Sequence, residues 1–311
     1  GVRAVRLGQP VKVREKLREA TMDAQMETHP LRRDLETQLE LNEKLNRRIG
    51  SMKGKEKGLA HRDIKKGWKE IRRIENQIRD DILDKTQIVC CTCIGSGNQI
   101  LDGRRFPQVL IDEATQATEP ASLVPLIRGA RQVVLVGDHK QLPPTVLSFR
   151  AEEKGLRRSL FERLVDLGIE PLLLTKQYRM HPAISKFPNQ QFYSNKLIDG
   201  VSAENRPAPA GLLWPDWDNP VAFIPVDGGE VVSPDGTSRE NPIEVSWVLK
   251  ITEDLLDAGE LTKKDIGIIT PYAGQVRAIR NSMSEELDDV EVRTVDGYQG
   301  REKEVIIFSC V

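Results

Sequence analysis

Acidic, amide and basic residues suited to phosphate chemistry follow short apolar runs in this sequence. Asp112 and Glu113 come directly after Val109-Leu110-Ile111. An aspartate at the end of a strand is placed to hold a magnesium ion through water, and an adjacent glutamate can accept a proton from water that attacks a γ-phosphate. An isolated Asp-Glu pair is more simply explained as two solvated turn residues. The pair becomes informative only when groups of related chemistry follow other strands.

Two further apolar runs lead into such groups. Gln141 comes shortly after the run 133–136, and Tyr178 and Arg179 come shortly after the run 172–174. An amide can hydrogen-bond both to a phosphate and to the attacking water, so Gln141 could sense the state of a nucleotide. Arg179 could supply positive charge to the phosphates, and Tyr178 could offer an aromatic face to a base.

A fourth segment combines a hydroxyl with a glycine-rich backbone. It runs from Thr294 to Glu302 and precedes the apolar run 305–308. Backbone of this kind can approach a phosphate or a sugar closely. Four segments with compatible chemistry therefore occur along one chain.

The elements that must position these groups can be predicted from periodicity. Short apolar runs that end in polar or glycine-rich sequence are typical of parallel strands buried on both faces. Helical stretches lie between several of these runs, at 156–167, 242–258 and 273–287. Strands that alternate with helices predict doubly wound α/β layers. The predicted strands are 88–91, 109–111, 133–136, 172–174, 266–269 and 305–308.

Residues 31–85 follow a different pattern. Two apolar series at helical spacing, Leu31 to Ile49 and Ile64 to Ile82, are separated by breaker-rich sequence between Gly50 and Gly54. They predict two amphipathic helices joined by a turn, which project from the first domain as a hairpin. Many lysines and arginines lie between the apolar positions. These cations form either a solvated helical face or a basic arm that touches a polynucleotide.

Taken together and in order, these segments resemble motifs of superfamily 1B helicases of the up-frameshift (nonsense-mediated-decay) type, and are also similar to the immunoglobulin-μ-binding-protein helicase. Two further segments, Cys91-Thr92-Cys93-Ile94-Gly95 and Thr270-Pro271-Tyr272-Ala273-Gly274-Gln275, match sequence that this family uses near nucleic acid. The resemblance covers nearly the whole chain. Motifs II to V correspond to Asp112-Glu113-Ala114-Thr115, Gly137-Asp138-His139-Lys140-Gln141, Gln177-Tyr178-Arg179-Met180-His181-Pro182 and Asp296-Gly297-Tyr298-Gln299-Gly300-Arg301-Glu302.

The resemblance implies an ATP-dependent helicase with ATP and Mg²⁺ as cofactors and single-stranded RNA or DNA as partner. It implies that Asp112 binds the metal, Glu113 activates water, and Gln141 and Arg179 contact the γ-phosphate. The resemblance implies four residues that bind the nucleotide and four that bind the nucleic acid. For the two threonines among the nucleic-acid residues, the alternative is that the hydroxyl caps a turn. These are Tyr178, Glu302, Gly137 and Asp138 for the nucleotide, and Thr92, Pro271, Tyr272 and Thr294 for the nucleic acid.

The implied fold class is α/β, with two RecA-like domains that sandwich the nucleotide in a cleft. The first would comprise residues 1–14 and 86–170, interrupted by a helical insertion at 15–85, and the second would comprise 171–311. Asp112, Gln141, Arg179 and Glu302 are then expected to converge on that cleft. Protein partners are expected to bind through the helical insertion.

Two motifs of the family have no counterpart in these 311 residues. No G-x-x-x-x-G-K-[ST] phosphate-binding loop occurs, and the sequence contains no counterpart of motif VI, whose arginine completes the phosphate site. We expect that the chain as given hydrolyses no ATP above background, whereas an intact parent with both motifs does so when a single strand is present. A non-catalytic scaffold that binds nucleic acid or a partner is the alternative, although a scaffold does not need Asp112, Glu113, Gln141 and Arg179.

Composition limits the remaining function classes. The net charge is −1, so any nucleic-acid surface must be local. Cys90, Cys91 and Cys93 lack a second Cys or His pair nearby, so we interpret them as buried thiols in a reducing compartment, with a metal or disulfide role as the alternative. No signal peptide or membrane-spanning run is present, which predicts an intracellular protein, cytoplasmic or nuclear, without a membrane partner.

Overall fold

The computed structural model describes residues 1–8 and 15–311, so part of the predicted segment 1–14 lies outside the described residues. The chain divides into two compact units. Unit 1 comprises residues 1–138 and 148–161, and unit 2 comprises residues 139–147 and 162–311. Both units mix helices and strands, as the α/β prediction requires. Each unit is described separately.

Unit 1 contains two parallel strand pairs. Strand β1 (Ala4–Arg6) pairs with β2 (Ile88–Cys90), and β3 (Gln108–Ile111) pairs with β4 (Gln132–Leu135) in parallel register. Helix α4 (Glu119–Leu126) forms part of the connection between β3 and β4. A parallel pair needs such a crossover, because the second strand must begin at the same edge as the first. The ends of β3 and β4 therefore lie at one edge.

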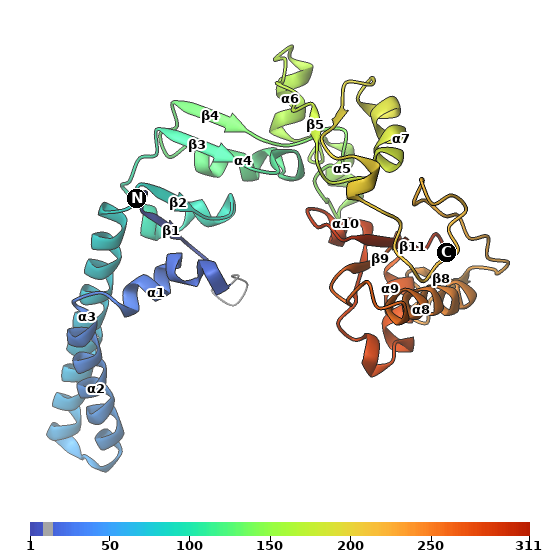
Figure 1. Ribbon diagram of the computed structural model, residues 1–311. Coiled ribbons are helices and arrows are strands. Elements are labelled where there is room, and N and C mark those ends of the chain that lie inside the picture. The colour runs from blue at the N-terminus through green and yellow to red at the C-terminus, as the bar shows by residue number, and fades with distance from the viewer. Residues whose placement is uncertain (9–14) are drawn as a thin grey trace. The chain divides into compact units, whose positions relative to one another are not determined.

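Unit 1 also carries a helical hairpin built from α2 (Arg32–Arg48) and α3 (Gly54–Asp84) (Figure 1). The two predicted helices are confirmed. Their buried residues share a core with α1 (Met22–Glu27) and β1, so apolar spacing along the helices fixes which faces meet. The buried members of this core are Val5, Met22, Leu35, Ile71, Ile74, Ile78, Ile82, Leu83 and Leu101.

Unit 2 is centred on a parallel sheet in the order β10-β9-β11. Its strands are β9 (Ile266–Thr270), β10 (Glu291–Thr294) and β11 (Val305–Phe308). Helices α8 (Pro242–Asp257) and α9 (Ala273–Ser282) contribute residues to the sheet's apolar core. The central strand β9 is buried over most of its length, as its apolar sequence predicts.

The remaining elements are short. The strand pair β5–β6 is parallel and the pair β7–β8 is antiparallel. The helices are α5 (Phe149–Glu153), α6 (Leu160–Asp166), α7 (Pro182–Phe192) and α10 (Val295–Tyr298), and the strands are β5 (Lys176–Gln177), β6 (Ile198–Asp199), β7 (Val231–Val232) and β8 (Arg239–Glu240).

Two predictions about strands are wrong. The run 172–174 is not a strand, and Leu172 is 99% exposed; the short strand β5 begins only at Lys176. Strands β3 and β4 form, but they are not covered on both faces, because Leu110, Val133 and Val134 are all exposed. An apolar sequence indicates that a strand tends to be buried. Whether it is buried depends on the elements that pack on the faces of its sheet, and in unit 1 these leave parts of the β3–β4 pair exposed.

The prediction of buried thiols is also wrong. Cys90, Cys91 and Cys310 are exposed and Cys93 is half-buried, and all four are free. Cys90 belongs to β2, whose residues are exposed or half-buried, which explains why an apolar neighbourhood in sequence did not become a buried one. No helix in residues 1–8 and 15–311 is both long enough and apolar enough to span a membrane.

Candidate nucleotide and nucleic-acid sites

Asp112 and Glu113 lie at the carboxyl end of β3, and both are exposed. Glu113 has a φ of 51°, in the left-handed region that non-glycine residues rarely adopt. Its backbone N–H donates to Asp112 Oδ1 at 3.0 Å, and Gln116 Nε2 donates to Glu113 Oε2 at 2.6 Å. The turn therefore holds both carboxylates at the strand end, and strained backbone of this kind is concentrated at functional sites.

Gly137 follows β4 and lies beside the same turn. An added Cβ at Gly137 would stand 3.1 Å from Thr115, so glycine permits the close approach of the two strand ends. Two backbone hydrogen bonds continue the pairing, from Val136 N to Ile111 O and from Ala114 N to Val136 O, both at 2.8 Å. Motif residues Gly137 and Asp138 thus stand next to the acidic turn at one edge of the β3–β4 pair.

Thr92 lies in the turn after β2. Its hydroxyl accepts a hydrogen bond from Gly95 N at 3.0 Å, and Gly95 has no room for a Cβ, which would stand 2.8 Å from that hydroxyl. Thr92 thus makes the turn-capping contact that was the alternative to a phosphate contact. Its side chain remains exposed, so one hydroxyl can cap the turn and still face solvent.

Arg179 and Glu302 meet within unit 2, although 123 residues separate them. Arg179 Nε donates to Glu302 Oε2 at 2.6 Å. The exposed ring of Tyr178 passes close to Gly200, where an added Cβ would come within 2.5 Å of it. Gln299 Nε2 donates to Leu142 O at 3.4 Å, which brings the segment carrying Gln141 beside the loop that carries Glu302.

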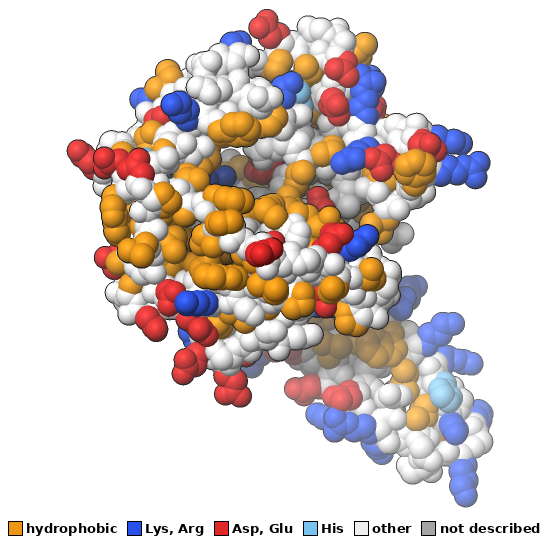
Figure 2. Space-filling view, turned by 90° about the vertical axis from the view of Figure 1, so that its right-hand side faces the viewer, with side chains coloured by type: hydrophobic (Ala, Val, Ile, Leu, Met, Phe, Trp, Pro, Cys, Tyr) orange, Lys and Arg blue, Asp and Glu red, His pale blue; other side chains and the backbone are white. Residues whose placement is uncertain are grey.

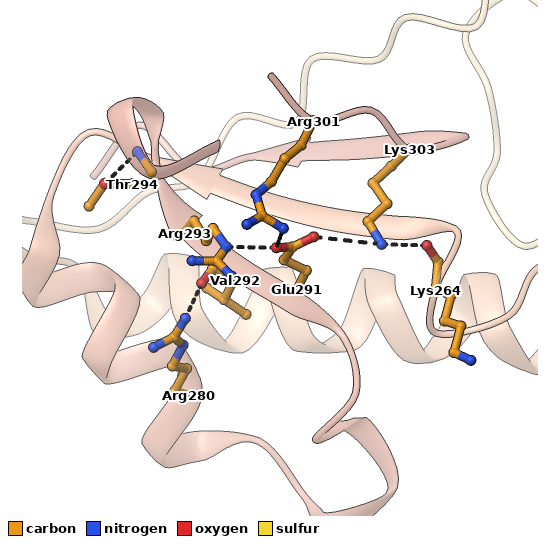
Figure 3. Close-up of polar contacts among 9 residues, drawn as sticks. Lys264, Arg280, Glu291, Val292, Arg293, Thr294, Arg301 and Lys303 are labelled. Carbon is orange, nitrogen blue, oxygen red and sulfur yellow. Dashed lines mark hydrogen bonds and ion pairs between the residues drawn. The ribbon is translucent and has the colours of Figure 1, made fainter. Parts of the chain in front are cut away.

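Pro271, Tyr272 and Thr294 lie at the carboxyl edge of the three-stranded sheet. Thr294 pairs in register with Thr270, and Pro271 and Tyr272 follow directly. Thr294 caps α10 by accepting from Gly297 N at 3.2 Å (Figure 3). Ligands of open parallel sheets bind outside this edge, so three of the four predicted nucleic-acid residues share a suitable location.

A cluster of charges lies on β10 and the loop before β11. Glu291 accepts from Arg293 Nε at 2.6 Å and from Arg301 Nη1 at 2.6 Å, and Lys303 Nζ lies 3.7 Å away (Figure 3). Partial burial raises the pKa of Glu291, but the hydrogen bond from Arg293 and the charges of the three cations outweigh it and lower the pKa below its usual value. Glu291 thereby fixes the direction of Arg301, the residue before Glu302.

A buried polar network, which sequence reasoning missed, positions the start of α9. Gln275 is fully buried; it accepts from Asn241 N at 2.8 Å and donates to Ser309 Oγ at 2.9 Å. Ser309 Oγ in turn donates to Glu244 Oε2 at 2.5 Å. Gln275 therefore joins α8, α9 and the end of β11. Because Gln275 belongs to the segment 270–275, the sequence suggested that it lies near nucleic acid. Its side chain is buried, so we interpret it instead as a residue that positions Pro271 and Tyr272.

Comparisons with known proteins show the family to which the chain belongs. Two family models, both described as an AAA domain, match residues 1–149 and 156–311. The chain belongs to the AAA domain family. Similar proteins include a regulator of nonsense transcripts 1 homolog from Drosophila melanogaster, 43% identical over 250 residues, and ATP-dependent helicase NAM7 from Saccharomyces cerevisiae, 44% identical over 261 residues. A third is ATP-dependent helicase upf1 from Schizosaccharomyces pombe, 43% identical over 251 residues.

The aligned regions cover most of this AAA chain but little of its relatives. They include 78%, 81% and 78% of the chain, and 21%, 26% and 27% of the Drosophila, Saccharomyces and Schizosaccharomyces proteins. The chain thus spans about a quarter of the length of these relatives. The family resemblance inferred from the motifs is confirmed by these similarities.

Within this AAA chain, the predicted site residues fall into two groups. Unit 1 carries Thr92, Asp112, Glu113, Gly137 and Asp138; unit 2 carries Gln141, Tyr178, Arg179, Pro271, Tyr272, Thr294 and Glu302. Within unit 1 the contacts join the Asp112–Glu113 turn to Gly137, and within unit 2 they join Arg179 to Glu302 and place Thr294 beside Thr270. The single cleft that would join Asp112 to Arg179 stays a prediction.

The donor set at the acidic turn suits a magnesium ion. Asp112 is an exposed carboxylate whose Oδ1 accepts a hydrogen bond from the backbone. Magnesium is commonly bound by one or two carboxylates together with water and substrate phosphates. No group of three or more His, Cys, Asp or Glu side chains suited to a metal occurs among the described residues.

Proposed function

We propose that this chain is the motor core of an ATP-dependent helicase or translocase that moves 5′ to 3′ along single-stranded RNA or DNA. The observation that carries the proposal is the turn after β3, where Asp112 and a strained Glu113 stand beside Gly137. The names of two relatives, ATP-dependent helicase NAM7 and ATP-dependent helicase upf1, support the same activity.

The proposed roles at the nucleotide follow from charge and hydrogen-bonding capacity. Asp112 holds Mg²⁺, which when bound neutralises phosphate charge, and Glu113 accepts the proton of the attacking water. Gln141 and Arg179 contact the γ-phosphate. Tyr178, whose ring is exposed, stacks on the base, and Glu302 hydrogen-bonds to the ribose. Gly137 and Asp138 line the phosphate side of the site.

The proposed path of the nucleic acid uses the strand-end turns. Thr92 and Thr294 contact phosphates through hydroxyls that also cap their turns, and Pro271 and Tyr272 contact the sugar and base. In this proposal two RecA-like domains, 1–14 with 86–170 and 171–311, hold the strand, and the helical segment 15–85 is an insertion in the first. The parallel pairs β1–β2 and β3–β4 and the parallel sheet β10-β9-β11 support it.

Steady-state phosphate release tests the catalytic assignment. The measurement compares this chain with a protein that adds a phosphate-binding loop before Gly1 and an arginine-bearing motif after Val311, each with and without a poly-pyrimidine strand. Only the longer protein is expected to turn over ATP, and only with the strand. A triphosphate is held by loop amides, a lysine, magnesium and arginines together, and loss of one arginine finger alone can cost about 10³ in rate.

Two substitutions in the longer protein separate chemistry from folding. Glu113→Gln keeps the shape of the side chain but cannot accept a proton, so turnover should be lost while nucleotide binding persists. Glu153→Gln removes another exposed carboxylate that has no assigned role, and it should leave the rate unchanged. Full activity of Glu113→Gln would falsify the mechanism, and strand binding without any turnover in the longer protein would favour a scaffold.

A further inference from the structure

The distal part of the α2–α3 hairpin carries a large local excess of positive charge. Residues 44–73 contain twelve Lys and Arg but three acids, a net charge of +9, whereas the whole chain has a net charge of −1. Figure 2 shows many Lys and Arg side chains on the part of the molecule at lower right. All twelve are exposed; they are Lys44, Arg47, Arg48, Lys53, Lys55, Lys57, Arg62, Lys65, Lys66, Lys69, Arg72 and Arg73.

Most of these cations have no acidic partner. Ion pairs join four of them to carboxylates: Lys44–Glu40, Arg47–Glu43, Lys66–Asp63 and Arg73–Glu70. No carboxylate of the described residues lies within ion-pair distance of the other eight, which are Arg48, Lys53, Lys55, Lys57, Arg62, Lys65, Lys69 and Arg72. The excess charge is therefore presented to solvent rather than neutralised within the fold.

Five of the unpaired cations form a stripe along α3, which we call the basic stripe: Lys55, Arg62, Lys65, Lys69 and Arg72. With 3.6 residues per turn they share the face opposite the buried Ile71, Ile74 and Ile78, and they span about 25 Å at 1.5 Å per residue.

Helix stability does not explain this arrangement. Lysines near the first turn of α3, such as Lys55 and Lys57, oppose the helix dipole, which favours acids at that end. Like charges three or four residues apart, such as Lys65 and Lys69, repel each other along the helix. A solvated face would be more stable with mixed charges. A surface that costs helix stability is better explained by a ligand of opposite charge.

An exposed tryptophan flanks the basic stripe. Trp68 is 50% exposed and lies one turn from Lys65 and Arg72. With the amide of Asn42 oriented to satisfy both its groups, Trp68 Nε1 donates to the Asn42 oxygen and Asn42 nitrogen donates to Ile64 O, both at 3.2 Å. The ring is thus anchored at its polar edge to a buried residue of α2, while part of its surface remains open to solvent.

We infer that the basic stripe and Trp68 form a nucleic-acid-binding site for single-stranded RNA or DNA on the hairpin, separate from the strand-end residues of the motor. Lysines and arginines along a groove or face bind the phosphates, and an exposed aromatic ring stacks an unpaired base. Duplex offers no unstacked base to Trp68, and an acidic protein offers no base at all. The site stands whether or not the proposed motor function does.

Equilibrium binding of the full chain to oligo-U and oligo-dT tests the inference. The variant to be tested carries four substitutions together, Arg62→Gln, Lys65→Gln, Lys69→Gln and Arg72→Gln. Its affinity at 0.1 M salt should fall by on the order of 10². The slope of the logarithm of the binding constant against the logarithm of salt concentration should also become shallower by about 3, since each phosphate contact on a single strand contributes about 0.7 to that slope. The matched control removes four exposed cations elsewhere, with Arg33, Lys154, Lys186 and Lys196 each changed to Gln, and should bind like the original chain.

Substitutions of Trp68 test the stacking contact independently of the charge. Trp68→Ala should weaken binding about fivefold or more, while Trp68→Phe should retain binding but lose the quenching of fluorescence that stacking on a base produces. Thr92→Val with Thr294→Val removes the proposed phosphate contacts of the motor and should leave this quenching intact, which separates failure of the hairpin site from failure of the motor assignment. The RNA and DNA arms show which sugar the site prefers.

Three outcomes would overturn the inference. The charge-neutralised stripe could bind like its control, Trp68→Ala could leave the affinity unchanged, or poly-glutamate could compete as well as oligo-dT. The last result would identify the stripe as a site for acidic protein segments. Helicity of each variant, measured by circular dichroism, must match the original chain, and the quenching lost in Trp68→Phe decides the case if the quadruple variant unfolds.

Discussion

At the scale of single residues, Glu113 combines an unfavourable backbone with a functional assignment. A left-handed conformation costs a non-glycine residue roughly 1 kcal/mol or more, yet Glu113 adopts a φ of 51° at the end of β3. Glycine would fit the turn at less cost but would remove the carboxylate. The proposed role in accepting a proton gives a reason for glutamate at this position that stability does not.

Paired substitutions of Glu113 isolate this strain. Glu113→Gly and Glu113→Ala both remove the hydrogen bond from Gln116, so their difference reports the backbone alone. We expect the glycine variant to be more stable than the alanine variant by about 1 kcal/mol, because alanine keeps the left-handed penalty. Urea unfolding of the two variants measures the difference. A more stable alanine variant would mean that residue 113 has ordinary backbone geometry.

At the scale of elements, one close contact between the two helices of the hairpin involves a glycine. An added Cβ at Gly67 of α3 would stand 2.4 Å from the side chain of Asn42 in α2. Asn42 is itself buried and holds Ile64 O and Trp68 Nε1. Because interiors are closely packed, a side chain at residue 67 would have to displace this amide. Glycine at residue 67 therefore allows the two helices to pack closely, although glycine inside a helix ordinarily lowers its stability.

The two interior glycines of α3 should therefore respond with opposite sign. Gly67→Ala forces the helices apart, and we expect it to lower the free energy of unfolding by about 1 kcal/mol after the gain in helix propensity is included. A Cβ added at Gly58 has no neighbour within 4 Å, so Gly58→Ala should raise the free energy of unfolding by about 0.5 kcal/mol or more. Thermal unfolding followed by circular dichroism compares them. An increase for both variants would show that Asn42 does not pack against Gly67.

The sequence predicted those elements whose pattern depends on local periodicity. Long apolar spacing predicted α2, α3 and α8, and apolar runs predicted β2, β3, β4, β9 and β11. Strand β10 was missed because two of its four residues, Glu291 and Arg293, are charged and pair with each other. Burial depends on neighbours distant in sequence, so the exposed thiols and the exposed Leu172 could not be predicted from a local pattern.

The candidate site also combines features that local sequence predicts with features that depend on residues distant in sequence. Motif spacing predicted that Asp112 and Gly137 follow strands, as they do, whereas Thr294 lies at the end of the missed strand β10. The pairing of Arg179 with Glu302 and the burial of Gln275 depend on long-range packing, which no window of sequence contains. The left-handed Glu113 was equally inaccessible, because a glutamate gives no signal for positive φ.

At the scale of the whole molecule, average properties conceal local ones. The net charge of −1 combines +9 on residues 44–73 with −10 on the rest of the chain, so a neutral total does not argue against a nucleic-acid partner. Apolar surface is distributed as unevenly. Ile268 and Ile266 are fully buried in unit 2, whereas Leu172 and Leu174 of the same unit are 99% and 84% exposed. The sequence predicts a buried strand at 172–174, and the structure contradicts it.

Serine substitutions at 172 and 174 decide between these two descriptions of the segment. Leu172→Ser with Leu174→Ser should change the free energy of unfolding by less than about 0.5 kcal/mol, because exposed side chains contribute little to stability. The same variant should bind less of a hydrophobic dye, since two exposed apolar side chains are removed.

Ile268→Val is the control; it should lower the free energy of unfolding by about 1 kcal/mol at a fully buried position and leave dye binding unchanged. Urea unfolding and dye fluorescence are measured on the same samples. A loss of several kcal/mol in the serine variant would mean that the segment is buried as a strand in solution, as its sequence predicts.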